Sequence, residues 1–172
     1  MAWRTKILAV AVLAILVGMG YSALAIVRNG FSAREEPTRL ETFLARHVWR
    51  IAIPVGAKQM KNPYPPDAPG SEATLKRWVE HCGLCHAHEG SGQTAIGRNL
   101  YPKPPDLRQS SVQELTDGEL YYIIRNGIRF TGMPAWDGKE DPDAIWQLIT
   151  LIRKLPNLFP MESKDGNSEG KK

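Results

Sequence analysis

The chain has 172 residues, of which 42% are hydrophobic and 23% are charged, and it contains only two cysteines. These values exclude a wholly disordered chain, a polytopic membrane protein and a disulfide-stapled scaffold, and they allow one modest domain with attachments. The excess of basic side chains lies in residues 1–70, with 9 basic and 4 acidic side chains, whereas residues 71–160 carry 10 and 11. A nucleic-acid-binding domain concentrates positive charge on its folded part, so we expect no nucleic-acid partner.

The N-terminal segment predicts a membrane anchor over residues 1–28. Residues 7–27 form an uncharged apolar run of 21 residues, preceded by Arg4 and Lys6 and followed by Arg28. At 1.5 Å per residue, such a run spans roughly 30 Å as a helix, enough to cross a bilayer core. A cleavable signal peptide is the alternative, because Ala23, Leu24 and Ala25 form a cleavage pattern. Either interpretation exports the rest of the chain.

Residues 29–70 predict an amphipathic helix followed by a connector. Within residues 37–53 the apolar side chains that share one helix face are Leu40, Phe43, Leu44, Val48 and Ile51, and the basic ones are Arg39, Arg46 and Arg50. Such a helix, beginning near Pro37 and stopped by Pro54, could lie on lipid headgroups, pack on a partner subunit or pack on its own domain. We interpret His47, beside the stripe, as a packing or interfacial residue. Residues 54–70 hold five prolines and two glycines, which favours an extended, semi-rigid connector and marks the domain boundary.

Both cysteines fall inside one Cys-x-x-Cys-His motif, formed by Cys82, Cys85 and His86. This is the attachment pattern of haem c. Two thiols one helical turn apart can reach two vinyl groups of one porphyrin, and the adjacent imidazole can reach its iron. A thioredoxin-like pair is one alternative, but it lacks a surrounding βαβ pattern. A zinc site is the other alternative. Its ligands would be His81, Cys82, Cys85 and His88, which lie closer together in sequence than the two separated pairs of usual structural zinc sites.

The remaining pattern is helical, with no credible strand ladder. Residues 72–81 place Leu75, Trp78 and Val79 on one face after a possible N-cap at Ser71. A second helix opens at the capping box of Thr116 and Glu119 and stops at Gly127. Asp141 and Pro142 begin a last helix that ends before Pro156, and its apolar stripe comprises Ile145, Leu148, Ile149, Ile152 and Leu155.

Met133 lies in a loop reading Thr-Gly-Met-Pro-Ala-Trp, 47 residues after His86. By itself, such a methionine is more often a packing residue than a ligand. With the attachment motif, however, residues 72 to about 156 resemble the class I cytochromes c. The resemblance implies an all-α fold around one covalently bound haem c, with first and last helices crossing. It also implies that His86 and Met133 are the axial ligands of the iron; the other methionines match nothing in the family, namely Met1, Met19, Met60 and Met161.

The chain departs from this family beyond the attachment motif. Many class I proteins have a Gly-Pro-x-Leu stretch whose backbone carbonyl accepts from the proximal histidine, whereas this chain has Arg98 within residues 97–100. The prolines follow later, at Pro102, Pro104 and Pro105, so the acceptor for His86 stays open. Arg98 could approach a haem propionate or lie solvated in its loop, and Trp136 could lie near the haem or serve packing alone.

These inferences predict a single-haem c-type cytochrome, an electron-transfer protein with no small-molecule substrate and no enzymatic role. The expected domains are an anchor at 1–28, the helix and connector at 29–70, a cytochrome domain at 71–160 and a polar tail at 161–172. The resemblance implies a location outside the cytoplasm, at the periplasmic face of a bacterial cytoplasmic membrane, with the lipid bilayer and membrane redox complexes as partners. The alternatives are a fixed subunit of a larger respiratory or photosynthetic complex and a gas-binding haem sensor.

Overall fold

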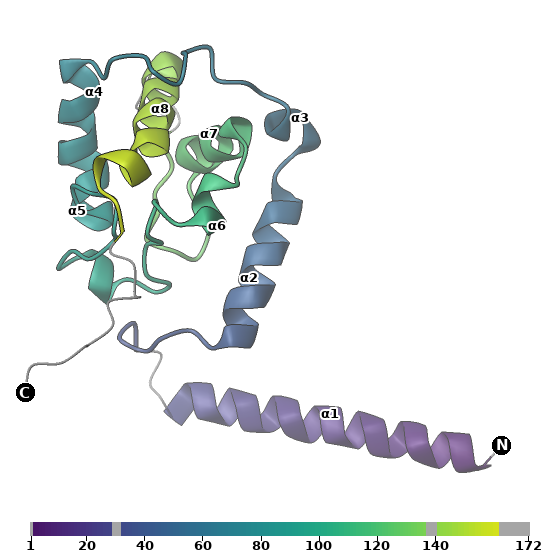
Figure 1. Ribbon diagram of the computed structural model, residues 1–172. Coiled ribbons are helices and arrows are strands. Elements are labelled where there is room, and N and C mark those ends of the chain that lie inside the picture. The colour runs from purple at the N-terminus through teal and green to yellow at the C-terminus, as the bar shows by residue number, and fades with distance from the viewer. Residues whose placement is uncertain (1, 29–31, 137–140, 162–172) are drawn as a thin grey trace, which may run out of the picture. The chain divides into compact units, whose positions relative to one another are not determined.

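The computed structural model describes residues 2–28, 32–136 and 141–161, so the predicted polar tail lies outside the described residues except for Met161. The chain divides into two compact units, Met1–Glu35 and Glu36–Lys172. Every regular element within the described ranges is helical, and none of these residues forms a strand (Figure 1). The all-α prediction is therefore confirmed.

The first unit contains helix α1, Ala2–Arg28, which covers the predicted anchor. Its residues Trp3–Arg28 are long and apolar enough to cross a membrane, judged by length and composition. The apolar side chains along α1 are exposed in the isolated chain. Side chains of this kind are stable in hydrocarbon and costly in water, so the helix fits a membrane anchor.

Helix α2, Arg39–Ala52, begins the second unit two residues later than predicted from Pro37. The reason is a capping box at Thr38: its hydroxyl accepts from the Glu41 N–H at 3.2 Å, and the Glu41 carboxylate accepts from the Thr38 N–H at 3.3 Å. These two bonds satisfy N–H groups that would otherwise lack partners at the helix start. The predicted stop is confirmed, since Ile53 is the C-cap and Pro54 follows it.

Residues 54–70 are not an extended tether. They include a short helix, α3 (Val55–Lys58), which lies against α7. The Asn62 amide donates to the Trp146 carbonyl at 3.1 Å and to the Thr150 hydroxyl at 3.0 Å, and Lys154 donates to the Ala68 carbonyl. The proline and glycine content of residues 54–70 predicted an extended chain, because composition carries no information about hydrogen bonds to distant residues. The segment is part of the second unit.

The cytochrome-like part of the chain contains five further α-helices among the described residues. They are α4 (Glu72–Arg77), α5 (Gly83–His86), α6 (Ser110–Gln113) and α7 (Asp117–Asn126), followed by α8 (Pro142–Leu158) as the last and longest of this unit. A π-helical turn, Trp78–Cys82, joins α4 to α5, and a 3₁₀ turn, Gly97–Asn99, follows. The predicted N-caps Ser71, Thr116 and Asp141 are confirmed.

The hydrophobic core forms where α8 meets α7 and the helix of residues 72–86. The predicted stripe of α8 is confirmed, with Ile149 fully buried. Tyr121 of α7 stacks on Trp146 of α8, with ring centroids 4.3 Å apart. On the first helix Trp78 is buried, but Leu75 and Val79 are about half exposed, so the predicted three-residue face is wrong for those two.

Helix α8 continues through Pro156 to Leu158, although we expected it to end before the proline. A proline inside a helix leaves the carbonyl four residues earlier without its donor, and here that carbonyl belongs to Ile152. The side-chain amide of Gln113 donates to the Ile152 carbonyl at 3.2 Å and to the Leu107 carbonyl at 2.7 Å. This replacement of the lost donor allows the last turn to persist.

Candidate haem-attachment site

The Cys-x-x-Cys-His motif occupies the end of the first helix of the domain. Cys82 closes the π-helical turn, and Cys85 and His86 lie in α5. Both cysteines are partly buried. The helical path places the two thiols about one turn apart, as predicted, with the imidazole immediately after them.

The chain reverses sharply after His86. Ala87 has φ +64° and ψ 165°, a conformation that side-chain-bearing residues rarely adopt and that costs about 1–3 kcal/mol. Hydrogen bonds hold the reversal: the Ala87 N–H donates to the Gly83 carbonyl at 3.0 Å, and the Gly92 N–H donates to the His86 carbonyl at 2.8 Å. These two bonds hold the backbone in place where the helix that carries the motif ends.

The imidazole of His86 faces the protein through Nδ1. This atom is buried and makes no hydrogen bond of regular geometry with the described residues. Burial lowers the pKa of His86, and the backbone carbonyl of Pro105 acts in the opposite direction and raises it. The backbone group that acts on the His86 pKa therefore comes from the proline-rich stretch and not from residues 97–100. With Nδ1 directed inward, Nε2 is the nitrogen left to bind iron, so the residue fits a haem ligand.

Gly97 packs directly on the attachment helix. A Cβ at this position would lie 2.5 Å from the carbonyl oxygens of Cys85 and Gly92, so only glycine permits the approach. The neighbouring Thr94 hydroxyl donates to the Leu84 carbonyl at 2.7 Å and accepts from the Gly97 N–H at 2.8 Å. Arg98 lies exposed and donates to the Gln93 carbonyl at 3.3 Å, which agrees with the surface interpretation of this arginine.

Met133 lies in a loop that hydrogen bonds to itself. The Ile128 N–H donates to the Met133 carbonyl at 3.2 Å, and the Thr131 hydroxyl accepts from the Met133 N–H at 3.0 Å. Gly127 begins this loop with φ +66°, where an added Cβ would meet the backbone of residues 133–135 at 2.7 Å. The loop backbone is consequently held in one arrangement, with the Met133 side chain partly buried against the core.

The attachment motif and the methionine loop meet at one groove. Its lining residues are Arg77, His81, Cys82, Ile124, Trp136 and Leu148. The rings of His81 and Trp136 lie 5.0 Å apart at an angle of 51°. Cys82, Met133 and Trp136 also pack against the same hydrophobic core. Of the four predicted haem-binding residues, only Cys82 lines this groove. Cys85 and His86 follow Cys82 along the chain, and Met133 lies three residues before Trp136.

The alternative interpretations of the cysteine pair receive no support. Within residues 2–28, 32–136 and 141–161, no three His, Cys, Asp or Glu side chains gather as they would around a metal ion. Over these same ranges the chain also has no strand, and hence no βαβ unit of the thioredoxin type. Sequence reasoning left open which backbone carbonyl acts on His86, and it missed the His81–Trp136 ring pair. In the sequence these features are visible only as a cluster of prolines and as two separate aromatic residues. Neither pattern indicates a contact with the attachment motif.

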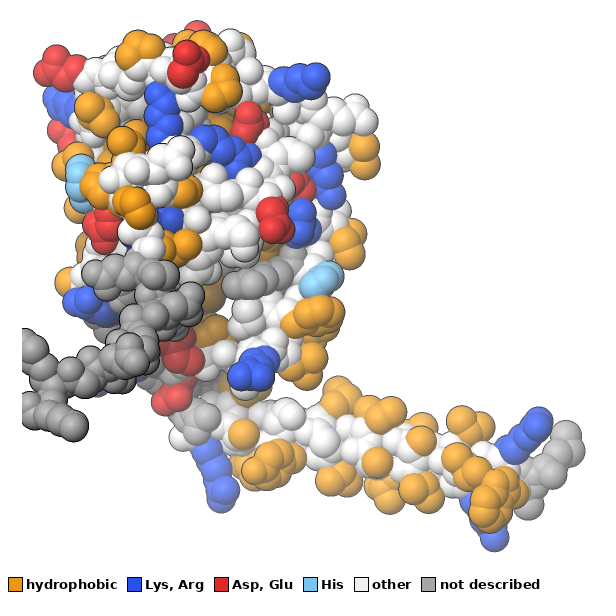
Figure 2. Space-filling model, viewed as in Figure 1, with side chains coloured by type: hydrophobic (Ala, Val, Ile, Leu, Met, Phe, Trp, Pro, Cys, Tyr) orange, Lys and Arg blue, Asp and Glu red, His pale blue; other side chains and the backbone are white. Residues whose placement is uncertain are grey.

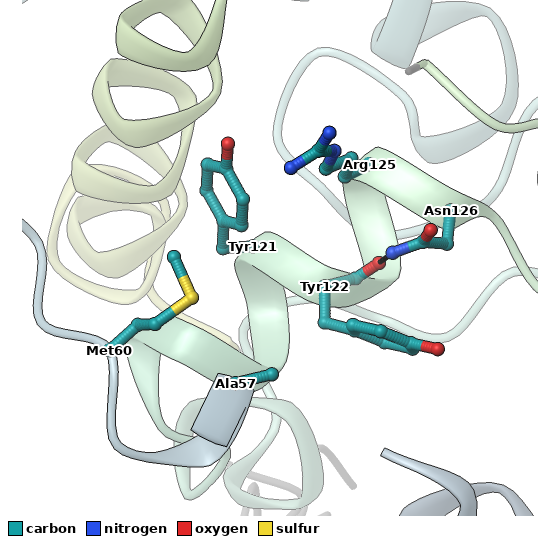
Figure 3. Close-up of a pocket in the computed structure, with 6 residues that line it drawn as sticks. All are labelled: Ala57, Met60, Tyr121, Tyr122, Arg125 and Asn126. Atoms are coloured by element: carbon teal, nitrogen blue, oxygen red, sulfur yellow. Dashed lines mark hydrogen bonds between the residues drawn. The ribbon is translucent and has the colours of Figure 1, made fainter. Parts of the chain in front are cut away.

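A larger cavity, of about 220 Å³, lies elsewhere, between α3, Met60 and α7. Figure 3 shows its lining, in which Met60 and Tyr121 approach each other and the Asn126 amide donates to the Tyr122 carbonyl. The lining residues are Ala57, Met60, Tyr121, Tyr122, Arg125 and Asn126, so none of the four predicted haem-binding residues takes part. This cavity is separate from the candidate site.

Comparison with known proteins assigns the helical unit. Residues 72–152 match the family profile described as cytochrome C oxidase, cbb3-type, subunit III, so this range is a c-type cytochrome domain. Among solved structures, the chain is similar to a chain of the reducing HAO-like protein complex of Kuenenia stuttgartiensis, at 21% identity and a TM-score of 0.44. That similarity covers 56% of this chain and 49% of the other, so this chain spans about half the length of that relative. No curated protein matches the chain.

Proposed function

We propose that this chain, whose residues 72–152 form a c-type cytochrome domain, carries electrons one at a time between membrane redox complexes. In this proposal α1 holds the domain at the periplasmic face of a bacterial cytoplasmic membrane. The observation that carries the proposal is the meeting of the Cys82 segment and the Trp136 segment at one groove, because this brings the attachment motif to the methionine loop.

Four residues would hold a single haem c. Cys82 and Cys85 would form its two thioether bonds, and His86 and Met133 would be the axial ligands of its iron. The burial of Nδ1 of His86 supports this role, because it leaves Nε2 as the nitrogen available to the iron. The hydrogen-bonded loop around Met133 supports the role of the sulfur as a ligand. Haem c supplies one-electron exchange when bound.

Electron transfer is favoured over catalysis by the ligand set. If an imidazole and a thioether from the chain itself fill both axial positions, no position is left for a small molecule. A methionine with a histidine also raises the reduction potential of a haem relative to stronger donor pairs. The role of the chain is then to set that potential and to position the haem edge for its redox partners.

A fixed subunit of a larger membrane complex is the second candidate. The profile match favours it, because that profile describes a subunit of a membrane oxidase. Native purification from membranes, with identification of the proteins that co-purify in stoichiometric amounts, separates the two candidates. A stable complex supports the fixed subunit, and recovery of the chain alone supports the mobile carrier.

The covalent attachment is tested with the double variant Cys82→Ser and Cys85→Ser in the full chain. Haem peroxidase stain should remain on the denatured wild-type protein and should be lost from the double variant. Leu84→Ala is the matched control, since Leu84 lies between the cysteines and is about half exposed; it should keep the stain. Stain that survives the double substitution would refute the attachment.

The distal ligand is tested with Met133→His. A second imidazole should keep the haem low-spin and lower its reduction potential substantially, since axial ligands help to set potentials over about 0.8 V in haem proteins. Met161→His is the control, because Met161 is exposed near the end of the described chain. An unchanged potential and absorption spectrum in Met133→His would show that Met133 does not bind the iron.

A further inference from the structure

Helix α2 presents an exposed apolar face away from its own domain. Five side chains, which are between 51% and 80% exposed, form this face: Leu40, Phe43, Leu44, Val48 and Ile51. Figure 2 shows hydrophobic side chains along the outer side of this helix. A stripe of this length left in water is unfavourable, and it usually marks an interaction surface.

The opposite face of α2 is already occupied by the domain. Trp49 packs against the hydrophobic core, and the hydroxyl of Tyr101 donates to the Glu41 carboxylate. That hydrogen bond raises the pKa of Tyr101 to about 12. Because these contacts fix the rotation of α2 about its axis, the apolar face cannot turn inward. The interpretation of α2 as an ordinary helix that buries its stripe in its own domain is therefore wrong.

Positive charge lies on one flank of the apolar face. Arg39 and Arg50 are eleven residues apart, which brings them to nearly the same side of the helix. His47 lies within the apolar face, where its ring contacts that of Phe43 at 4.0 Å. An apolar face bordered by arginines matches a helix lying in the headgroup region of a bilayer, where the cations meet anionic lipid.

The chain connection keeps α2 close to any membrane that α1 crosses. Helix α1 ends at Arg28 and α2 begins at Arg39. The ten intervening residues can extend about 35 Å at most. This reach is about the thickness of a bilayer core, so the first residue of α2 stays within one such distance of the end of α1. A protein partner would need to be brought to this face, whereas the lipid surface is already there.

We propose that α2 lies flat in the lipid headgroup region, with the five apolar side chains directed into the bilayer and Arg39 and Arg50 on anionic headgroups. This inference rests on the membrane-spanning role of α1 in the proposed function, and it goes beyond it. A second attachment fixes how the cytochrome domain is oriented to the membrane plane. A single flexible tether would leave that orientation free.

The test uses the full haem-loaded chain in vesicles of phosphatidylcholine and phosphatidylglycerol. Leu44→Cys and Ala45→Cys are each labelled with a nitroxide, since the two native cysteines are blocked as thioethers. These neighbours are both exposed and lie about 100° apart around the helix. The Leu44 label should collide more with lipid-soluble oxygen and less with a water-soluble nickel complex, whereas the Ala45 label should stay accessible to nickel. Equal nickel access at both positions would overturn the proposal.

Two further measurements distinguish lipid from protein as the group that covers the apolar face of α2. At fewer than one protein per vesicle, protection of the Leu44 label from both oxygen and nickel would indicate cover by protein and would overturn the lipid assignment. The double variant Arg39→Gln and Arg50→Gln should reduce the burial of the label in anionic vesicles. Resistance of the chain to carbonate extraction reports on α1 alone, so a failure of the anchor is separated from a failure of α2. The haem absorption spectrum verifies that each variant is folded.

Discussion

The indole nitrogen of Trp78 donates a hydrogen bond to the backbone carbonyl of His88, 2.9 Å away. The two residues lie on either side of the attachment motif, and Trp78 is only 2% exposed. The bond ties the helix that carries the cysteines to the loop that leaves it. A buried side chain thus serves both the core and the geometry of the site.

Trp78→Phe should therefore destabilise the haem-loaded protein by about 2 kcal/mol, because it removes the donor and leaves a gap beside a buried ring. Urea unfolding followed by circular dichroism measures this change. Val79→Ala, at the adjacent and half-exposed position, should change stability by less than about 0.5 kcal/mol. Equal effects of the two substitutions would contradict the role of the Trp78–His88 bond.

Gly118 allows the short helix α3 to lie on α7. A Cβ at Gly118 would be 1.8 Å from the Ala57 carbonyl oxygen, so Gly118→Ala must push α3 away. We expect a loss of about 1–3 kcal/mol in unfolding free energy, typical of an overpacked contact. Gly56→Ala is the control within α3 itself, since a Cβ there meets nothing within 4 Å. It should be neutral or slightly stabilising.

Gly127→Ala should disturb the methionine loop. Besides the steric overlap with residues 133–135, alanine is strained at φ +66°. If Met133 binds iron, this variant should bind carbon monoxide in the reduced state more readily than the wild type does, which an absorption titration measures. Gly132→Ala, in the same loop, meets only the side chain of Leu100, which can move. A larger effect from Gly132→Ala than from Gly127→Ala would contradict this account.

Asp106 and Arg108 form a two-pronged ion pair near the site. The carboxylate oxygens accept from Nε at 2.9 Å and from the terminal nitrogen at 2.7 Å, and this bonding holds the pKa of Asp106 below its usual 3.8. A carboxyl whose pKa is lower in the folded than in the unfolded protein stabilises the fold at pH values above the unfolded pKa. This stabilisation is lost as the pH falls through the folded pKa.

Asp106→Asn should accordingly lower the unfolding free energy at pH 7 by about 1–2 kcal/mol. The difference from the wild type should shrink as the pH falls below 3.8. Urea unfolding over a series of pH values measures both effects. Glu80→Gln breaks the exposed Lys76–Glu80 pair, whose closest atoms are 3.9 Å apart, and it should have little effect at any pH. A difference for Asp106→Asn that does not depend on pH would contradict the ion-pair explanation.

Local spacing predicted the features that depend on neighbouring residues. The capping box of Thr116 and Glu119 and the N-cap Asp141 follow from bonds that span two or three residues, and both are present. The stripe of α8 was predictable for the same reason, because one helix face needs only the helical period. The role of Met133 came from the family resemblance and not from its own position.

The features that sequence reasoning missed depend on distant partners. Helix α8 passes Pro156 because Gln113 donates to the Ile152 carbonyl, a residue 39 positions away. Residues 54–70 fold onto the domain because Gly118 leaves room for Ala57 and because Asn62 reaches Trp146. The effect of the Pro105 carbonyl on His86, which the sequence left open, also joins residues far apart in the chain. No local pattern distinguishes these residues from solvated loop residues.

The centre of the core is contributed by α8, which follows the other described helices in the sequence. Until α8 has emerged, the core around Trp78 and Tyr121 is incomplete, because Ile145, Trp146 and Ile149 belong to α8. A nascent chain that ends before α8 therefore presents residues 82–86 without a finished fold around them. If Cys82 and Cys85 bind a porphyrin before the core closes, that porphyrin would give α8 an apolar surface on which to fold.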